Sequence, residues 1–255
     1  MKTLLLAAGV GSRLGGLTDN VHKSLLEING DQTLLDYQLR ALASAELNDI
    51  HIVVGHCAES VANKCLAYSD LHSIRLIKND YYRSKNIDWS VYLGLQSVED
   101  DVIYIEGDMV VHPKILAMLK SATADVCLIV DNKPRSQYVD TVVRVHPDNK
   151  VVSIEVKEHG FHTEASLKAS LGEFVCAIKL SNRARRLLLA KLQDFTFDGV
   201  IKFYNAINDI SSEVVFDYHD TSGLEWVEVD NVEDLARAKR LCAETNFGLS
   251  KGFAQ

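Results

Sequence analysis

The strongest constraint on the fold is an alternation of short apolar runs with helical patterns over the first part of the chain. The runs are rich in β-branched and aliphatic residues, which favour strands, and the segments between them repeat apolar residues with a period near 3.6. This alternation predicts a mainly parallel sheet with helices on both faces. The predicted strands are Thr3–Ala8, Ile50–Gly55, Ile74–Ile77 and Val102–Glu106, and the predicted helices are 34–42, Ala58–Ala67 and Asp88–Val98.

The second part of the chain has a different pattern, because its strands follow one another closely. From Val126 to Lys179 this favours an antiparallel extension of the sheet. The last helix is expected to begin near Val232, with Asn231 as its N-cap. The predicted strands here are Val126–Val130, Thr141–Val145, Val151–Val156, Glu173–Lys179, Glu213–Phe216 and Trp226–Val229.

Length and composition narrow the class of protein. The 255 residues are 47% hydrophobic and 24% charged, as in ordinary globular proteins, and no linker or repeat divides them into parts. A net charge of -8 argues against sequence-independent nucleic-acid binding, which needs a basic surface. No stretch approaches the ~18 uninterrupted apolar residues of a membrane span. The five cysteines are scattered along the sequence, as expected for reduced structural residues, so we expect a cytoplasmic protein. A homodimer is one option for its assembly.

The first strand runs into an unusual loop, "GVGSRLGG", with Arg13 inside it and Lys23 beyond it. An ordinary loop, a secretion signal and a phosphate cradle are the three alternatives. The apolar stretch breaks too early for a secretion signal. Successive glycines expose backbone N–H groups to an anion, although the spacing matches neither G-x-G-x-x-G nor a P-loop. The two cations favour the phosphate cradle.

Here the sequence resembles a known family. "LLLAAGVGSRLGGLT…HKSLLEING" is similar to the nucleotidyltransferase signature L-A-A-G-x-G-S-R-L, followed about ten residues later by K-x-L-L. The resemblance implies a single nucleotidyltransferase domain over residues 1–255, with a Rossmann-like three-layer α/β/α fold, a mixed, mostly parallel sheet and a small antiparallel extension. It further implies that Arg13 neutralises the departing pyrophosphate and Lys23 the transferred phosphoryl group. The implied nucleotide contacts in this loop are Leu6, Ala7, Ala8, Gly9, Gly11 and Ser12.

Two aspartates follow predicted strands directly and are candidate ligands for Mg²⁺. Asp108 lies in "YIEGDMVV" and Asp230 in "WVEVDNVEDL", and both match acidic positions of the family. In open α/β sheets, ligands bind at the carboxyl ends of the strands, and nucleotidyl transfer needs charge neutralisation there. Glu106 and Glu228 are weaker candidates. Each aspartate alone is also compatible with a helix cap or a turn.

Three further segments resemble phosphocholine and 2-aminoethylphosphonate cytidylyltransferases. "NIDWSV" matches an N-x-x-x-S-[LVI] stretch and implies that Asn86 and Ser90 line the pocket, although helix capping explains it too. "LGEFVCAIKLS" matches a family strand except at Cys176, and "VVSIEVKEH" resembles the strand that delivers a second catalytic lysine, Lys157. An ammonium group would need aromatic faces and a carboxylate. Residues of those types are Trp89, Tyr82, Tyr204, Glu173 and Asp198, and we assign acceptor contacts to Trp89, Glu173 and Tyr204.

The sequence therefore predicts a Mg²⁺-dependent enzyme that transfers CMP from CTP to a small phosphorylated amine, phosphocholine or 2-aminoethylphosphonate, with release of pyrophosphate. A sugar-1-phosphate nucleotidyltransferase is the nearest alternative. A non-catalytic nucleotide-binding regulator on the same fold is the second. The identity of the acceptor stays open at this point.

Overall fold

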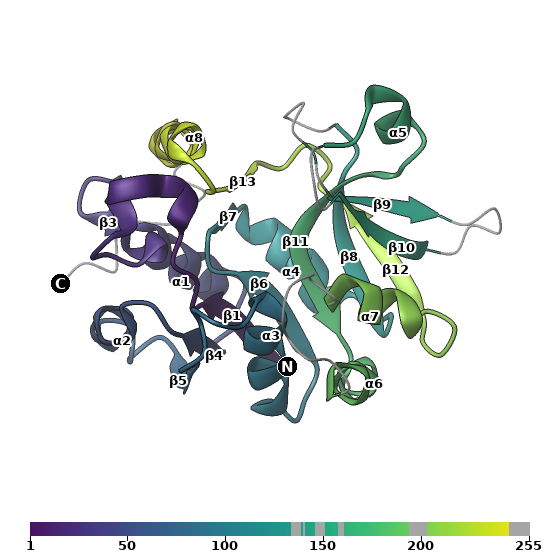
Figure 1. Cartoon of the computed structure of the whole chain (residues 1–255), viewed down its shortest axis with the longest axis horizontal. Helices are drawn as coiled ribbons and strands as arrows, with labels where there is room; N and C mark the ends of the chain where they lie inside the picture. Colours follow the sequence, from purple (N-terminus) through teal and green to yellow (C-terminus); the bar gives the residue numbers. More distant parts are fainter. Residues whose placement is uncertain (134–138, 140, 146–150, 158–160, 194–202, 245–255) are drawn as a thin grey trace.

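Nine strands form the central sheet of the computed structural model, which describes residues 1–133, 139, 141–145, 151–157, 161–193 and 203–244. The strand order is β10-β9-β11-β6-β1-β4-β5, and β8 pairs with both β11 and β12 (Figure 1). The strands are β1 (Lys2–Ala7), β4 (Asp49–Val54), β5 (Ser73–Lys78), β6 (Val102–Glu106), β8 (Val126–Asp131), β9 (Thr141–Val145), β10 (Val151–Val156), β11 (Gly172–Leu180) and β12 (Phe216–Asp220).

The part of the sheet built by the first strands is parallel, as predicted. β1 pairs in parallel with β4 and β6, and β4 pairs in parallel with β5. In this register Leu6 lies opposite Glu106, and Ala7 lies opposite Val54. The carboxyl ends of these strands therefore meet at one edge of the sheet, where the loops that follow them lie close together.

Helices cover the sheet on both faces, which confirms the α/β fold. α3 packs against β1, β4 and α6, while α1 packs against α4, which contacts β8 and β11. Thr33 begins α1 with a capping box, and Asn231 caps α8 by accepting a hydrogen bond from the backbone N–H of Asp234 at 2.9 Å. The helices are α1 (Leu34–Ser44), α2 (Ala58–Leu66), α3 (Ile87–Gln96), α4 (Pro113–Ser121), α5 (Glu164–Lys168), α6 (Asn182–Gln193), α7 (Phe203–Asp209) and α8 (Val232–Glu244).

The later strands form the predicted antiparallel extension. β11 runs antiparallel to β6, β8 and β9, and β9 runs antiparallel to β10. One strand boundary was wrong, because the strand expected at Glu213–Phe216 is β12 at Phe216–Asp220. The N–H of Glu213 donates to the carbonyl of Ile210 at 2.9 Å, so these residues close a turn after α7 and cannot begin a strand.

Further short strands pair outside the central sheet, and among those in the described residues only the strand expected at Trp226–Val229 was predicted. β7 (Met109–Val111) pairs antiparallel with β13 (Trp226–Glu228), and β2 (Glu27–Asn29) pairs with β3 (Gln32–Thr33). Apolar residues of α8, β7 and β13 form a second core cluster. All five cysteines are free, and no helix among the described residues is long and apolar enough to cross a membrane. The domain span 1–255 stays a prediction.

Candidate active site

Two glycines allow the loops at the carboxyl edge of the sheet to approach each other. A Cβ atom at Gly107, just after β6, would lie 2.1 Å from the carbonyl oxygen of Leu6 in β1. A Cβ atom at Gly55, just after β4, would lie 2.8 Å from the carbonyl oxygen of Ala8. Since neither position has room for a side chain, the loop after β1 sits directly against the ends of both neighbouring strands.

The glycine-rich loop is an ordered structure made of two short 3₁₀ helices, η1 (Ser12–Thr18) and η2 (Lys23–Leu25). Gly11 has a φ of 70°, and its carbonyl accepts a hydrogen bond from the Thr18 hydroxyl at 2.9 Å. His22 caps η2, because its Nδ1 accepts a hydrogen bond from the backbone N–H of Ser24 at 3.1 Å. Burial and the neighbouring Lys23 charge lower the pKa of His22 to about 4, so this cap is neutral at neutral pH.

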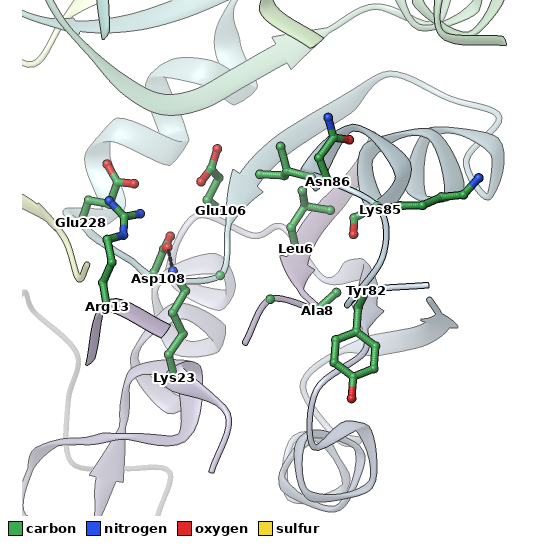
Figure 2. Close-up of a pocket in the computed structure, with 14 residues that line it drawn as sticks. Leu6, Ala8, Arg13, Lys23, Tyr82, Lys85, Asn86, Glu106, Asp108 and Glu228 are labelled. Atoms are coloured by element: carbon green, nitrogen blue, oxygen red, sulfur yellow. Dashed lines mark hydrogen bonds and ion pairs between the residues drawn. The ribbon is translucent and has the colours of Figure 1, made fainter. Parts of the chain in front are cut away.

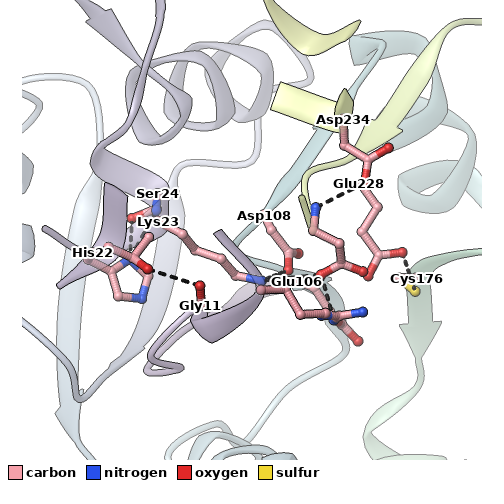
Figure 3. A network of polar contacts seen from close by, with 12 residues as sticks. Gly11, His22, Lys23, Ser24, Glu106, Asp108, Cys176, Glu228 and Asp234 are labelled. Atoms are coloured by element: carbon pink, nitrogen blue, oxygen red, sulfur yellow. Dashed lines mark hydrogen bonds and ion pairs between the residues drawn. The ribbon is translucent and has the colours of Figure 1, made fainter. Parts of the chain in front are cut away.

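The loop aims its two cations at the acidic residues. Figure 3 shows the Lys23 side chain running from η2 to the carboxylate of Asp108, with which its ammonium forms an ion pair. The same nitrogen lies 3.8 Å from Oδ1 of Asp230, and Nη2 of Arg13 lies 2.6 Å from that oxygen. Burial opposes the charge on Lys23, but the surrounding carboxylates outweigh it and raise the pKa of the lysine above its usual value.

Three carboxylates converge because β13 pairs with β7. The backbone N–H of Val229 donates to the carbonyl of Asp108 at 3.0 Å, which places Glu228 and Asp230 on either side of this contact. Oxygen atoms of Asp108, Glu228 and Asp230 all lie within 4.8 Å of one another. Oδ1 of Asp108 is buried and has no hydrogen-bond partner in the described part of the chain. An all-oxygen set with an unsatisfied oxygen fits a hard divalent cation such as Mg²⁺.

Glu106 lies half-buried beside this cluster. It accepts hydrogen bonds at Oε1 from the hydroxyls of Tyr104, at 2.9 Å, and Tyr204, at 3.1 Å. Burial and the nearby Asp108 charge raise the pKa of Glu106 to about 7, and burial with the same charge raises the pKa of Glu228 well above its ordinary value. The acidic residues therefore outnumber the cations in this region, and they repel one another.

Two adjoining pockets open at this cluster. The first, of about 210 Å³, is lined by Leu6, Ala8, Gly9, Arg13, Lys23, Tyr82, Lys85, Asn86, Ile87, Ser90, Glu106, Gly107, Asp108 and Glu228 (Figure 2). The second, of about 420 Å³, is lined by Arg13, Asn86, Ile87, Tyr104, Glu106, Thr141, Val156, Glu173, Phe174, Cys176, Phe203, Tyr204, Glu228 and Asp230. Because the two linings share Arg13, Asn86, Ile87, Glu106 and Glu228, they are halves of one cleft.

Most predicted site residues line this cleft. The first half contains Leu6, Ala8, Gly9, Lys23, Ser90 and Asp108, the second contains Glu173, Tyr204 and Asp230, and both contain Arg13 and Asn86. Asn86 also caps α3, since its Oδ1 accepts a hydrogen bond from the backbone N–H of Asp88 at 3.2 Å.

Five predicted residues lie elsewhere. Ala7 is buried in β1, and Gly11 and Ser12 shape the loop behind the pocket. Trp89 stacks on Tyr92 outside the described linings of both pockets. Lys157 is exposed, and its ammonium lies 3.8 Å from Glu155. A sixth residue that we considered, Asp198, lies outside the described residues.

Sequence reasoning missed several lining residues. Tyr104 and Phe203 have buried side chains that line the second pocket, and Lys85 lines the first. The two aromatics gave no signal beyond that of ordinary core residues. Tyr82, which we considered as a residue near the acceptor, lies in the first pocket instead.

The sequence is similar to those of several curated proteins. The choline-phosphate cytidylyltransferase of Streptococcus pneumoniae is 37% identical over 108 residues, which are 42% of this chain and 44% of that protein. The CMP-5'-(3-aminopropyl)phosphonate synthase of Streptomyces rubellomurinus is 26% identical over 250 residues, 93% of this chain and 38% of that protein. The matched region thus spans less than half of either relative.

A solved structure supports the fold. That of the CTP:phosphocholine cytidylyltransferase from Streptococcus pneumoniae superposes with a TM-score of 0.74 at 21% identity, covering 94% of this chain and 98% of that one. The family model described as the MobA-like NTP transferase domain matches residues 3–195, which is most of the chain. The chain therefore belongs to the family of MobA-like NTP transferase domains.

Proposed function

We propose that the protein is a cytidylyltransferase, which transfers CMP from CTP to a small phosphorylated amine and releases pyrophosphate. One observation carries the proposal: the paired cations Arg13 and Lys23 meet three carboxylates at the junction of two pockets of different character. A nucleotide and an acceptor phosphate would have to meet at such a junction, because the reaction joins them at one phosphorus atom.

The first pocket suits the nucleotide. The loop after β1 would hold the triphosphate, with Gly9 exposing its backbone and the charges of Arg13 and Lys23 facing the phosphates. Lys23 is only 17% exposed, so its charge acts through a medium of lower dielectric than water. We assign it to the transferred phosphoryl group and the more exposed Arg13 to the departing pyrophosphate.

Asp108 and Asp230 are the residues that we assign to a bound Mg²⁺, with Glu228 close enough to join them. The cation would neutralise the charge that builds up on the phosphoryl oxygens. In the structure Lys23 and Arg13 hold the two aspartates in place by ion pairs. The buried oxygen of Asp108 has no hydrogen-bond partner among the described residues, and this observation favours a cation here.

The second pocket suits an acceptor with an amine. Its lining combines the carboxylates of Glu173, Glu106 and Glu228 with the aromatic rings of Phe174 and Tyr204. Aromatic faces and carboxylates together bind ammonium groups, quaternary ones included. These features are the reason that we prefer phosphocholine or 2-aminoethylphosphonate to a sugar phosphate.

The phosphate or phosphonate oxygen of the acceptor is the nucleophile in this scheme. It attacks the α-phosphorus of CTP, a new P–O bond forms, and the bond to the β-phosphate oxygen breaks to release pyrophosphate. Because that oxygen is ionised at neutral pH, no residue has to remove a proton from it. Lys157 would reach the acceptor only after leaving its ion pair with Glu155.

Pyrophosphate release tests the proposal, measured with each of the four NTPs and a panel of phosphocholine, 2-aminoethylphosphonate and sugar-1-phosphates in the presence of Mg²⁺. We expect turnover with CTP and an amine-containing acceptor. Turnover with a sugar-1-phosphate alone would replace the proposed acceptor class. Binding of CTP without pyrophosphate release from any acceptor would support a non-catalytic regulator instead.

A further inference from the structure

A buried pair of polar side chains, Asn79 and Ser90, lies at the wall of the first pocket. Asn79 directly follows β5, and its backbone N–H donates to the carbonyl of Val54 at 2.8 Å. Its side-chain Nδ2 lies 2.9 Å from Oγ of Ser90 in α3. Asn79 is 1% exposed and Ser90 is 6% exposed, so water does not compete for this contact.

The direction of this hydrogen bond follows from a second contact. The Asn79 side chain also receives the backbone N–H of Tyr81 at 2.9 Å, and because an N–H can only donate, the atom facing it is the amide oxygen. The amide nitrogen therefore faces Ser90 and donates to it. Ser90 thus accepts from Asn79 and keeps its own hydroxyl proton for another partner.

No such partner lies in the part of the chain that the structure describes. Within the described part of the chain, the Ser90 hydroxyl makes its one hydrogen bond with Asn79. Since Ser90 lines the first pocket, its proton is available to a ligand there. The pocket therefore presents a hydroxyl whose proton is available as a donor, held by a neighbour that a ligand does not need to touch.

The Ser90 side of the pocket is where the nucleobase would lie. Figure 2 shows Arg13, Lys23 and Asp108 gathered at one side and Tyr82 and Asn86 at the other. With the phosphates at the cations, the base extends toward the second side. The lining there includes Leu6, Ala8, Ile87 and Tyr82, whose carbon atoms offer apolar surface to a flat ring.

We propose that the Ser90 hydroxyl donates a hydrogen bond to the ring nitrogen N3 of cytosine, and that Asn79 is the positioning residue that sets this direction. The inference rests on the proposed function, which places a cytidine nucleotide in this pocket. N3 of cytosine accepts a hydrogen bond, whereas N3 of uracil carries a proton. A uracil could only donate to the remaining lone pair of the hydroxyl, which would leave the hydroxyl proton without a partner in the ligand, so the pair selects CTP over UTP.

Two substitutions test the direction of the bond. Ser90→Ala removes the donor and is expected to lower the preference for CTP over UTP about tenfold or more. Asn79→Asp keeps the shape but replaces the amide donor with an acceptor. At pH 8 the introduced carboxylate would take the Ser90 proton, so that the hydroxyl offers a lone pair to the pocket. This variant is expected to prefer UTP.

The preference is measured as the ratio of dissociation constants for CTP and UTP by calorimetry, and as the ratio of kcat/KM values. Ser97→Ala is the matched control, because Ser97 is the C-cap of α3 and does not belong to the described lining of the pocket. Its hydroxyl donates to the carbonyl of Gly94 at 2.7 Å. Ser97→Ala should leave both ratios unchanged. Thermal unfolding verifies that each variant is folded.

The outcomes separate this inference from the proposed function. If the unmodified protein transfers CMP, but the CTP-to-UTP ratios of Ser90→Ala and Asn79→Asp lie within twofold of its own, the inference is overturned. The proposed function is then unaffected. Equal losses for CTP and UTP in Asn79→Asp would overturn it as well. If the unmodified protein transfers no nucleotide, the proposed function falls, and the binding ratios still decide the role of the pair.

Discussion

Replacing Lys23 with methionine should remove catalysis far more than it removes stability. Methionine keeps the unbranched shape of the side chain and loses its charge. The Lys23 ammonium lies 3.8 Å from Oδ1 of Asp230, and we take this as a typical distance between the ammonium and a charged group in the cleft. Two unit charges about 4 Å apart interact by about 4 kcal/mol at an effective dielectric constant of about 20. If Lys23 meets the transferred phosphoryl group at that range, its loss slows turnover about a thousandfold.

The control is Lys64→Met. Lys64 also pairs with a buried carboxylate, that of Asp36 at 2.6 Å, but this pair belongs to α1 and α2 and does not line the cleft. Each variant loses a close ion pair with a buried aspartate, and Lys23→Met also loses the longer contact with Asp230, so both should unfold at a lower urea concentration than the unmodified protein. Lys64→Met should keep its kcat.

The assay is pyrophosphate release at saturating CTP and acceptor, well below the unfolding temperature of each variant. Separate measurement of kcat and KM shows whether the charge acts on the transition state or on binding alone. A Lys23→Met enzyme that keeps more than about a tenth of its kcat would refute the role given to this residue. The same loss in Lys64→Met would show that reduced stability, and not the missing charge, explains the result.

Three more predictions follow from the same geometry. Asp108→Asn and Asp230→Asn should each reduce turnover at least about a hundredfold while circular dichroism stays unchanged, since each removes charge from the cation site; an unchanged rate in either would contradict the metal assignment. Asp36→Ala should lower the free energy of unfolding by about 3–5 kcal/mol in urea at neutral pH, because it breaks a buried ion pair. Although burial opposes ionisation, hydrogen bonds from Lys64 and other neighbours lower the pKa of Asp36 in the folded protein. The difference in unfolding free energy between the unmodified protein and Asp36→Ala should therefore stay constant down to about pH 5 and shrink as the pH falls through the folded pKa. Gly107→Ala should lower the melting temperature by several degrees or prevent soluble expression, because its Cβ would lie 2.1 Å from a backbone oxygen in β1; a variant as stable as the unmodified protein would show that the loops can separate freely.

Most of the first part of the fold was predictable because β1, β4 and β6 are mainly apolar runs buried on both faces, whereas β5, at the edge of the sheet, is largely exposed. β1 and β6 consist almost wholly of such residues, and the helices between them show a clear 3.6 period. β7 could not be recognised from the sequence, since its three residues form a strand only by pairing with β13, which is distant in the sequence. The misplaced start of β12 has a related cause, because its polar residues form a strand by pairing with β8.

The candidate site divides in the same way. Asp108 could be placed at the sheet edge because it follows β6 almost directly in sequence. Trp89 and Lys157 were chosen by residue type and local resemblance, and neither property indicates which face of an element meets the pocket. The second pocket joins residues of β6, β11 and α7 whose spacing in the sequence carries no periodic signal, so its combination of acids and aromatics needed the structure.

The balance of charge in the cleft explains why a cation and a nucleotide should bind together. Glu106, Asp108, Glu228 and Asp230 face two basic side chains, and the pKa values of Glu106, Glu228 and Asp230 are raised because burial and mutual repulsion disfavour their ionised forms. A free triphosphate would add further negative charge to this excess. A divalent cation that arrives with the nucleotide offsets both the phosphates and the carboxylates. Under the proposed function, the acidic residues would therefore favour the metal-bound nucleotide over the free one, and Lys23 would hold the cluster together until the nucleotide binds.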